Sequence, residues 1–174
     1  MQTKDLTAVA LLAALAAVCS QFLLPTPWGV PVSLGTLAVF LAAGLLGAKG
    51  AMVSMLIYLA LGAVGVPVFA GFRGGLSVLA GPTGGYLVGY LALAALSGAL
   101  CGRLPDTKFR LPLAFACGLA VCYTLGTLWF AVSTETTVLS ALTLCVLPYL
   151  PADAVKIVVA AVLCERLRVV QRSK

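Results

Sequence analysis

The sequence contains no histidine and few charged residues of either sign. The absence of histidine excludes serine–histidine and cysteine–histidine catalysis and most zinc sites. Charged residues make up only 9% of the chain, whereas a soluble domain needs about 25% to cover its surface. Apolar residues make up 62%, and the mean hydropathy is +1.14. A surface of this kind is stable against lipid, so we expect an all-α integral membrane protein.

The six cysteines form no Cys-x-x-Cys pair, and all of them lie within or beside apolar runs. This pattern is typical of small packing residues in helices and argues against a disulfide framework or a metal site. We therefore expect no metal and no cofactor. The cysteines are Cys19, Cys101, Cys117, Cys122, Cys145 and Cys164.

The apolar runs predict a single transmembrane domain, 1–174, of about six helices. A spanning helix needs roughly 20 residues. The run 34–66 is too long for one span, so we expect two short helices with a tight turn around Lys49. Residues 137–147 are expected to form a short helix on the outer face, and 67–85 a glycine-rich loop. The remaining predicted spans are 6–24, which ends at a connector containing Pro25, Pro27, Gly29 and Pro31, and 86–101, 111–132 and 151–167.

The net charge of +6 is explained by topology. With six spans, nearly all basic residues lie in short loops or tails on one side, which the positive-inside rule makes cytoplasmic. Both termini are then cytoplasmic, and only Arg73 lies in an outer loop. The residues assigned to the cytoplasmic side are Lys4, Lys49, Arg103, Lys108, Arg110, Arg166, Arg168, Arg172 and Lys174.

Three charged residues call for a functional interpretation. Asp153 and Lys156 are three residues apart, so they share one face of the last helix. Each charge near a helix centre costs about 2.5–3.5 kcal/mol on insertion scales. The pair is either a self-neutralising salt bridge or a ligand site in a polar cavity. Arg73 is either a headgroup anchor or a cation for an acidic ligand.

The segment GPTGGY (81–86) predicts a tight turn into the fourth span, because glycine permits close backbone approach. Its spacing fits neither a P-loop nor a dinucleotide fingerprint. Tyr86 and Tyr90 are four residues apart on one helix face and are either interfacial belt residues or cavity walls. Tyr123 presents the same choice, with the belt favoured.

Small residues recur along the first predicted helix. Ala10, Ala13, Ala14 and Ala17 give two overlapping Ala-xxx-Ala spacings. Such spacings let another helix approach closely in lipid. The approaching helix belongs either to a partner or to this chain.

Four segments resemble, in order and spacing, the BioY family of biotin-binding S components of energy-coupling factor (ECF) vitamin transporters. The resemblance covers nearly the whole chain. One departure is Gly35, where family members often carry glutamine. The segments are VPVSLGTL (30–37), GVPVFAGFRGG (65–75), GPTGGY (81–86) and LPYLPADAVK (147–156).

The resemblance implies a six-helix S component in a prokaryotic plasma membrane, with a biotin pocket open to the extracellular side. The first helix would dock onto a transmembrane coupling subunit that carries two cytoplasmic ATPases. Asp153 would accept from the ureido N–H groups, Lys156 would meet the ureido carbonyl, and Arg73 would pair with the carboxylate. The other pocket residues expected are Thr83 and Gly84, with Tyr86, Tyr90 and Tyr123 as walls.

Other functions remain open at this stage. A stand-alone carrier of biotin or another small solute would use Asp153 and Lys156 as a proton-linked gate, although no inverted repeat is evident. A structural protein that binds only other helices is a further alternative. An enzyme is disfavoured, because no histidine, paired acidic site or serine–lysine constellation is present. Nothing in the sequence indicates a nucleic-acid partner.

Overall fold

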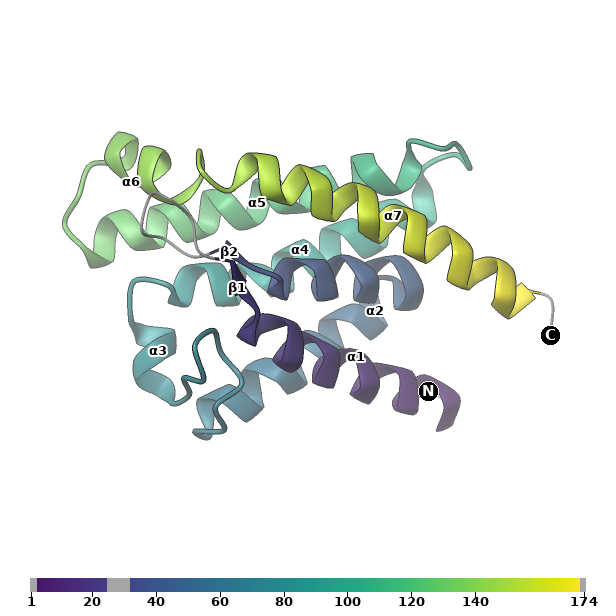
Figure 1. Cartoon of the computed structure of the whole chain (residues 1–174), viewed down its shortest axis with the longest axis horizontal. Helices are drawn as coiled ribbons and strands as arrows, with labels where there is room; N and C mark the ends of the chain where they lie inside the picture. Colours follow the sequence, from purple (N-terminus) through teal and green to yellow (C-terminus); the bar gives the residue numbers. More distant parts are fainter. Residues whose placement is uncertain (1–2, 25–31, 173–174) are drawn as a thin grey trace.

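The computed structural model describes residues 3–24 and 32–172, and this part of the chain is almost entirely helical (Figure 1). Four helices (α1, α2, α4 and α5) are long and apolar enough to cross a membrane. The helices α6 and α7, bent by 55° between them, would make a fifth crossing if they form one span. The elements are α1 (Thr3–Gln21), β1 (Leu23–Leu24), β2 (Val32–Ser33), α2 (Gly35–Ala63), α3 (Leu76–Ala80), α4 (Gly84–Arg103), α5 (Arg110–Ser133), α6 (Val138–Cys145) and α7 (Leu150–Arg172).

Helix α2 is broken at Gly47, where φ is 68° and ψ is −175°. The break lies two residues before the expected turn at Lys49, because glycine adopts positive φ without the steric cost of a side chain. Figure 1 shows the two halves of α2 running in different directions. At a rise of about 1.5 Å per residue, the halves 35–46 and 48–63 are about 18 Å and about 24 Å long.

The break is packed tightly against α4. A Cβ added to Gly98 would lie 2.4 Å from the Ala48 backbone nitrogen, so only glycine fits at this crossing. Because Gly98 has no Cβ, α4 can approach the backbone of the α2 turn at Gly47 and Ala48 directly, as is common between helices in lipid.

The first span ends earlier than expected. Helix α1 stops at Gln21, and Leu23 and Leu24 instead pair in an antiparallel ladder with Ser33 and Val32. The carboxamide of Gln21 donates to the carbonyl of Phe69 (3.1 Å), which fixes the helix end against a distant loop. The proline-rich connector (Pro25, Pro27, Gly29, Pro31) and Lys174 lie outside the described residues, as do the side chains of Arg168 and Arg172.

The segment 67–85, expected to be a glycine-rich loop, contains the short helix α3. The other boundaries differ from the expected ones by a few residues, since α4, α5 and α7 extend beyond the predicted spans at one or both ends. The short helix expected at 137–147 is present as α6.

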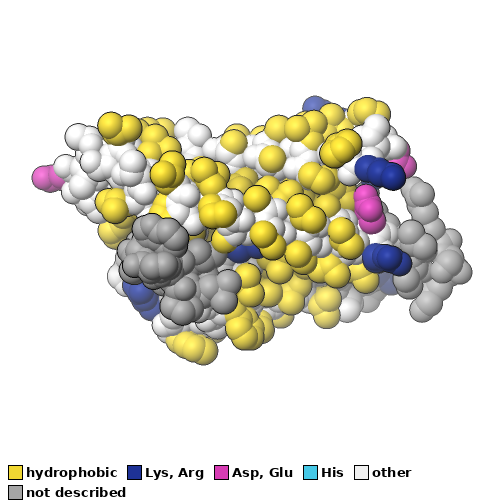
Figure 2. All heavy atoms as spheres, turned by 45° about the horizontal axis from the view of Figure 1, so that its top comes forward, with side chains coloured by type: hydrophobic (Ala, Val, Ile, Leu, Met, Phe, Trp, Pro, Cys, Tyr) yellow, Lys and Arg dark blue, Asp and Glu magenta, His cyan; other side chains and the backbone are white. Residues whose placement is uncertain are grey.

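The core lies where α1, α4 and α7 pack against α2 and where α5 packs against α4. Phe40 of α2 stacks on Phe115 of α5 with ring centroids 5.1 Å apart. No disulfide joins any of the six cysteines, all of which lie in the described part of the chain, and Cys101, Cys122 and Cys164 are buried. Figure 2 shows an apolar band across the middle of one face, with charged side chains mainly toward the two ends. This distribution suits a protein whose middle lies in hydrocarbon.

The start of α1 and the end of α7 lie at the same end of the molecule, whereas β1, β2, α3 and α6 lie toward the other (Figure 1). The bundle thus has one end that carries the termini and another that carries the loops, the strands and the short helices.

Candidate ligand-binding cavity

A cavity of about 470 Å³ lies within the described part of the chain and is lined by side chains from each of the helices α1 to α7. It includes seven of the eight predicted ligand residues, and all five tyrosines of the chain line it. Tyr86, Tyr90 and Tyr123 are therefore cavity walls, not an interfacial belt. The lining is completed by aliphatic, aromatic, hydroxyl and thiol side chains, among them Ser20, Leu23, Ser33, Thr36, Val78, Leu87, Leu119, Cys122, Phe130, Leu144 and Cys145.

Asp153 and Lys156 form a buried ion pair at the start of α7. The distance from Lys156 Nζ to Asp153 Oδ1 is 2.7 Å, and the two residues are 6% and 2% exposed, respectively. Asp153 lies in the first turn of α7, where the helix dipole favours a carboxylate. The structure thus combines both sequence interpretations, because the pair is a salt bridge and also borders the cavity.

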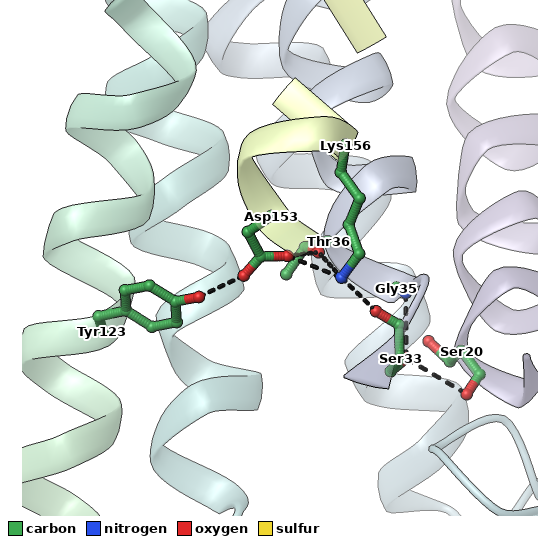
Figure 3. A network of polar contacts seen from close by, with 7 residues as sticks. All are labelled: Ser20, Ser33, Gly35, Thr36, Tyr123, Asp153 and Lys156. Atoms are coloured by element: carbon green, nitrogen blue, oxygen red, sulfur yellow. Dashed lines mark hydrogen bonds and ion pairs between the residues drawn. The ribbon is translucent and has the colours of Figure 1, made fainter. Parts of the chain in front are cut away.

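Three further groups hold this pair in place (Figure 3). Lys156 Nζ donates to the Ser33 carbonyl (2.6 Å) and to Thr36 Oγ1 (3.2 Å). Thr36 Oγ1 donates to Asp153 Oδ1 (3.2 Å), and the Tyr123 hydroxyl donates to Asp153 Oδ2. The pair therefore joins α7 to β2, α2 and α5, which fixes the carboxylate in one orientation.

Hydroxyl groups gather around Gly35. A Cβ at this position would lie 2.8 Å from Ser20 Oγ, 3.0 Å from the Tyr90 hydroxyl and 3.3 Å from Ser33 Oγ. Ser33 Oγ accepts from the Gly35 N–H (3.0 Å), and the Ser20 and Tyr58 hydroxyls are 3.0 Å apart. The space beside Gly35 is thus bordered by hydroxyl groups from α1, α4 and β2.

Arg73 borders the cavity from the loop between α2 and α3. Its backbone forms a two-way bridge with Phe69, closing a tight turn in which Gly71 and Phe72 have positive φ. Gln21 Oε1 accepts from the Phe72 N–H (2.8 Å), which ties the turn to α1. Among the described residues, the guanidinium has no ion pair or hydrogen bond, so it is available to an anion.

Comparison with known proteins decides the family. A family model described as the BioY family matches residues 1–172. The chain belongs to the BioY family. It is 37% identical to the probable biotin transporter BioY of Pyrococcus horikoshii, over 97% of this chain and 98% of that protein. It is 35% identical to the biotin transporter BioY of Rhodobacter capsulatus, over 83% of this chain and 82% of that protein.

A solved crystal structure agrees in fold. The 2.1 Å crystal structure of the S-component for biotin from an ECF-type ABC transporter superposes with a TM-score of 0.84 at 27% identity. The match covers 97% of this chain and 94% of the other. The resemblance found in the sequence motifs is confirmed, and the fold is that of an S component.

The residues of the segment GPTGGY (81–86) have different roles: some line the cavity and others allow close helix packing. Thr83 lines the cavity, but Gly84 does not. A Cβ on Gly84 would lie 1.7 Å from the Leu79 carbonyl oxygen, and one on Gly85 would lie 2.2 Å from Trp129 Cβ. Both glycines therefore permit close packing of α4 against its neighbours. Trp129 reinforces the turn by donating to the Gly81 carbonyl (2.9 Å).

The alanines of α1 face in two directions. Ala10 and Ala14 are exposed, whereas Ala13 is 2% exposed and belongs to the core, and Ala17 is half-buried against it. The two overlapping spacings thus separate into an outer pair, Ala10 and Ala14, and an inner pair that packs within the BioY fold.

Sequence reasoning missed several lining residues. Thr36, Ser33, Ser20 and Tyr58 carry most of the hydroxyl contacts around the ion pair and Gly35. Ser33 and Thr36 do fall in the motif at 30–37. The only available signal was a pair of hydroxyl residues at the start of an apolar run.

Proposed function

We propose that this chain is the high-affinity biotin-capture subunit, the S component, of an ECF-type vitamin importer. The observation that carries the proposal is the cavity lined by the Asp153–Lys156 ion pair. Its volume of about 470 Å³ falls within the range of about 300–1,000 Å³ typical of small-molecule sites.

The chemistry of the lining suits biotin. Biotin has a ureido ring with N–H donors and a carbonyl, an apolar thioether ring and a carboxylate tail. Asp153 Oδ2 accepts one bond from Tyr123 and keeps capacity for a ureido N–H. The tyrosines and aliphatic residues enclose the apolar ring, and Arg73 supplies a cation for the carboxylate. Thr83 and Tyr86 complete the wall.

We further propose six membrane crossings, with the two halves of α2 forming separate spans. The charge distribution supports cytoplasmic termini, since Lys4, Lys49, Arg103 and Lys108 then share one side. The cavity would open at the end that carries α3 and α6, on the extracellular side of a prokaryotic plasma membrane. No ATP-binding motif is evident in the sequence, so energy would come from a transmembrane coupling subunit with two cytoplasmic ATPases.

The exposed pair Ala10 and Ala14 supports docking of α1 onto that coupling subunit, because small residues allow close helix contact in lipid. Replacing Ala14 with leucine should leave biotin binding intact and abolish ATP-driven uptake in vesicles. Replacing the buried Ala13 with leucine should instead destabilise the fold. Uptake unaffected by Ala14→Leu would exclude this docking face.

The first test is equilibrium binding of radiolabelled biotin to the purified chain in detergent, with unlabelled riboflavin and thiamine as competitors. Saturable binding displaced by biotin alone supports the capture role. A folded sample that does not bind biotin would refute it. Uptake into vesicles that contain this chain alone would favour the stand-alone carrier.

A further inference from the structure

The donors of the ion-pair network are fully used. A lysine ammonium group has three N–H donors. In this structure they meet Asp153 Oδ1 at 2.7 Å, the Ser33 carbonyl at 2.6 Å and Thr36 Oγ1 at 3.2 Å. The single hydroxyl protons of Thr36 and Tyr123 both go to Asp153. The network therefore has no donor to spare for a ligand.

The network does have acceptor capacity to spare. A carboxylate offers about four lone-pair positions, and Asp153 uses three of them, for Lys156, Thr36 and Tyr123. The Tyr123 hydroxyl donates its proton to Asp153, and its oxygen accepts no hydrogen bond from any described residue. This end of the cavity is thus suited to ligand N–H groups, and a ligand carbonyl must find its donor elsewhere.

Tyr90 supplies such a donor. It lines the cavity, and its hydroxyl would be 3.0 Å from a Cβ at Gly35, beside Ser33. Among residues 3–24 and 32–172 the hydroxyl has no hydrogen-bond partner. Since no fully buried side-chain polar atom in this part lacks one, the hydroxyl reaches the cavity space.

The other tyrosine hydroxyls near the polar end each have a hydrogen-bond partner in the protein. Tyr58 is 1% exposed and bonds to Ser20, which is 2% exposed. Tyr86 bonds to Thr127 at 3.1 Å, and Tyr123 bonds to Asp153. Tyr90 differs from all three because its hydroxyl faces the cavity and has no hydrogen-bond partner among the described residues.

We propose that the Tyr90 hydroxyl donates the hydrogen bond to the ureido oxygen of the ligand, while Lys156 positions the Asp153 carboxylate. This inference rests on the proposed biotin-binding function and adds a specificity-determining residue to it. Tyr90 selects a ligand with an acceptor between two N–H groups. Asp153 accepts from one of these N–H groups through its remaining lone-pair position, so the two residues together recognise the ureido pattern.

The test compares two ligands on three forms of the full-length chain. The ligands are biotin and its thioxo analogue, in which the ureido oxygen is replaced by sulfur, a weaker acceptor. The forms are wild type, Tyr90→Phe and Tyr86→Phe. Wild type should prefer biotin. Tyr90→Phe should bind biotin about tenfold more weakly and lose most of the preference. Tyr86→Phe should keep the preference, because its hydroxyl is already bonded to Thr127.

The outcomes separate the two proposals. Wild type that binds neither ligand would refute the proposed function itself. Wild type that binds biotin, together with Tyr90→Phe that keeps the full preference, would overturn only the role of Tyr90 and would assign the carbonyl to Lys156. If Tyr90→Phe does not fold, Tyr90→fluorotyrosine, a stronger donor of almost the same size, should tighten biotin binding more than binding of the thioxo analogue. No such difference would equally overturn the inference.

Discussion

The charged groups that line the cavity are held in opposite ways. Asp153 and Lys156 are buried, bonded to each other and braced by Thr36, Tyr123 and the Ser33 carbonyl. Arg73 is exposed, lies on a loop and has no partner for its guanidinium among the described residues. The ion pair is thus held in a fixed geometry without a ligand, whereas the Arg73 guanidinium is not fixed by any described residue.

This difference indicates different contributions to recognition. A preassembled carboxylate loses little freedom when a ligand binds, so it can discriminate between hydrogen-bonding patterns. A lone exposed cation attracts an anion but imposes little geometry. We therefore expect changes at the ion pair to affect binding and folding together, and changes at Arg73 to affect only the affinity for a negatively charged ligand.

The largest effect is expected from Asp153→Asn. The amide keeps the shape of the side chain but removes the charge that pairs with Lys156, so biotin affinity should fall about a hundredfold or more. Equilibrium binding with labelled biotin measures this. Asp106→Asn is the matched control, because Asp106 also pairs with a basic residue, Arg110, but lies outside the cavity with its side chain 78% exposed. Unchanged affinity in Asp153→Asn would remove Asp153 from the ligand site.

Lys156→Met tests whether the pair is also structural. The substitution leaves a buried carboxylate without its counter-charge, which should destabilise the fold by about 3 kcal/mol or more. The double variant Asp153→Asn, Lys156→Met has no buried charge and should recover most of this stability without recovering biotin binding. Thermal unfolding in detergent measures the first effect. A double variant as unstable as the single one would show that the charges are not energetically coupled.

The sequence predicted the long helices because each apolar run is long enough to cross a membrane, and it predicted Asp153 and Lys156 because charges are rare in such runs. It did not predict the exact break in α2. Gly47 and Gly50 flank Lys49, and the choice between them depends on Gly98 of α4 packing against Ala48. That contact joins residues far apart in the chain.

The supporting residues of the site were not predicted for a similar reason. Thr36 bonds to residues 117 and 120 positions away, and a threonine in an apolar run carries no sign of this. Gly84 was assigned to the ligand because it belongs to a motif, yet a motif glycine can serve packing alone. Only the position of the Leu79 carbonyl distinguishes the two roles.

Arg73→Gln should have a smaller and more selective effect. Loss of one charge-assisted contact should weaken biotin binding about tenfold and leave binding of biotin amide, whose tail is neutral, nearly unchanged. Thermal stability should stay the same, because no described residue pairs with the guanidinium. Arg103→Gln, at the end of α4, controls for net charge. An equal loss for both ligands would mean that Arg73 acts on the loop and not on the carboxylate.

The smallest effect is expected from Gly35→Ala, which probes the hydroxyl cluster that borders the preassembled site. The new Cβ would press on Ser20 Oγ at 2.8 Å and on the Tyr90 hydroxyl at 3.0 Å. Both are ends of side chains that can shift by a few tenths of an ångström, so we expect biotin affinity to fall only about threefold, a cost below about 1 kcal/mol.

Gly102→Ala is the matched control for Gly35→Ala, since Gly102 also lies in a helix and a Cβ there would meet nothing within 4 Å. It should raise thermal stability slightly, by about 0.4–1 kcal/mol, without changing affinity. If Gly35→Ala bound biotin as tightly as wild type, the Tyr90 hydroxyl would have room to move without consequence. Biotin recognition at the polar end of the cavity would then depend on the Asp153–Lys156 pair alone.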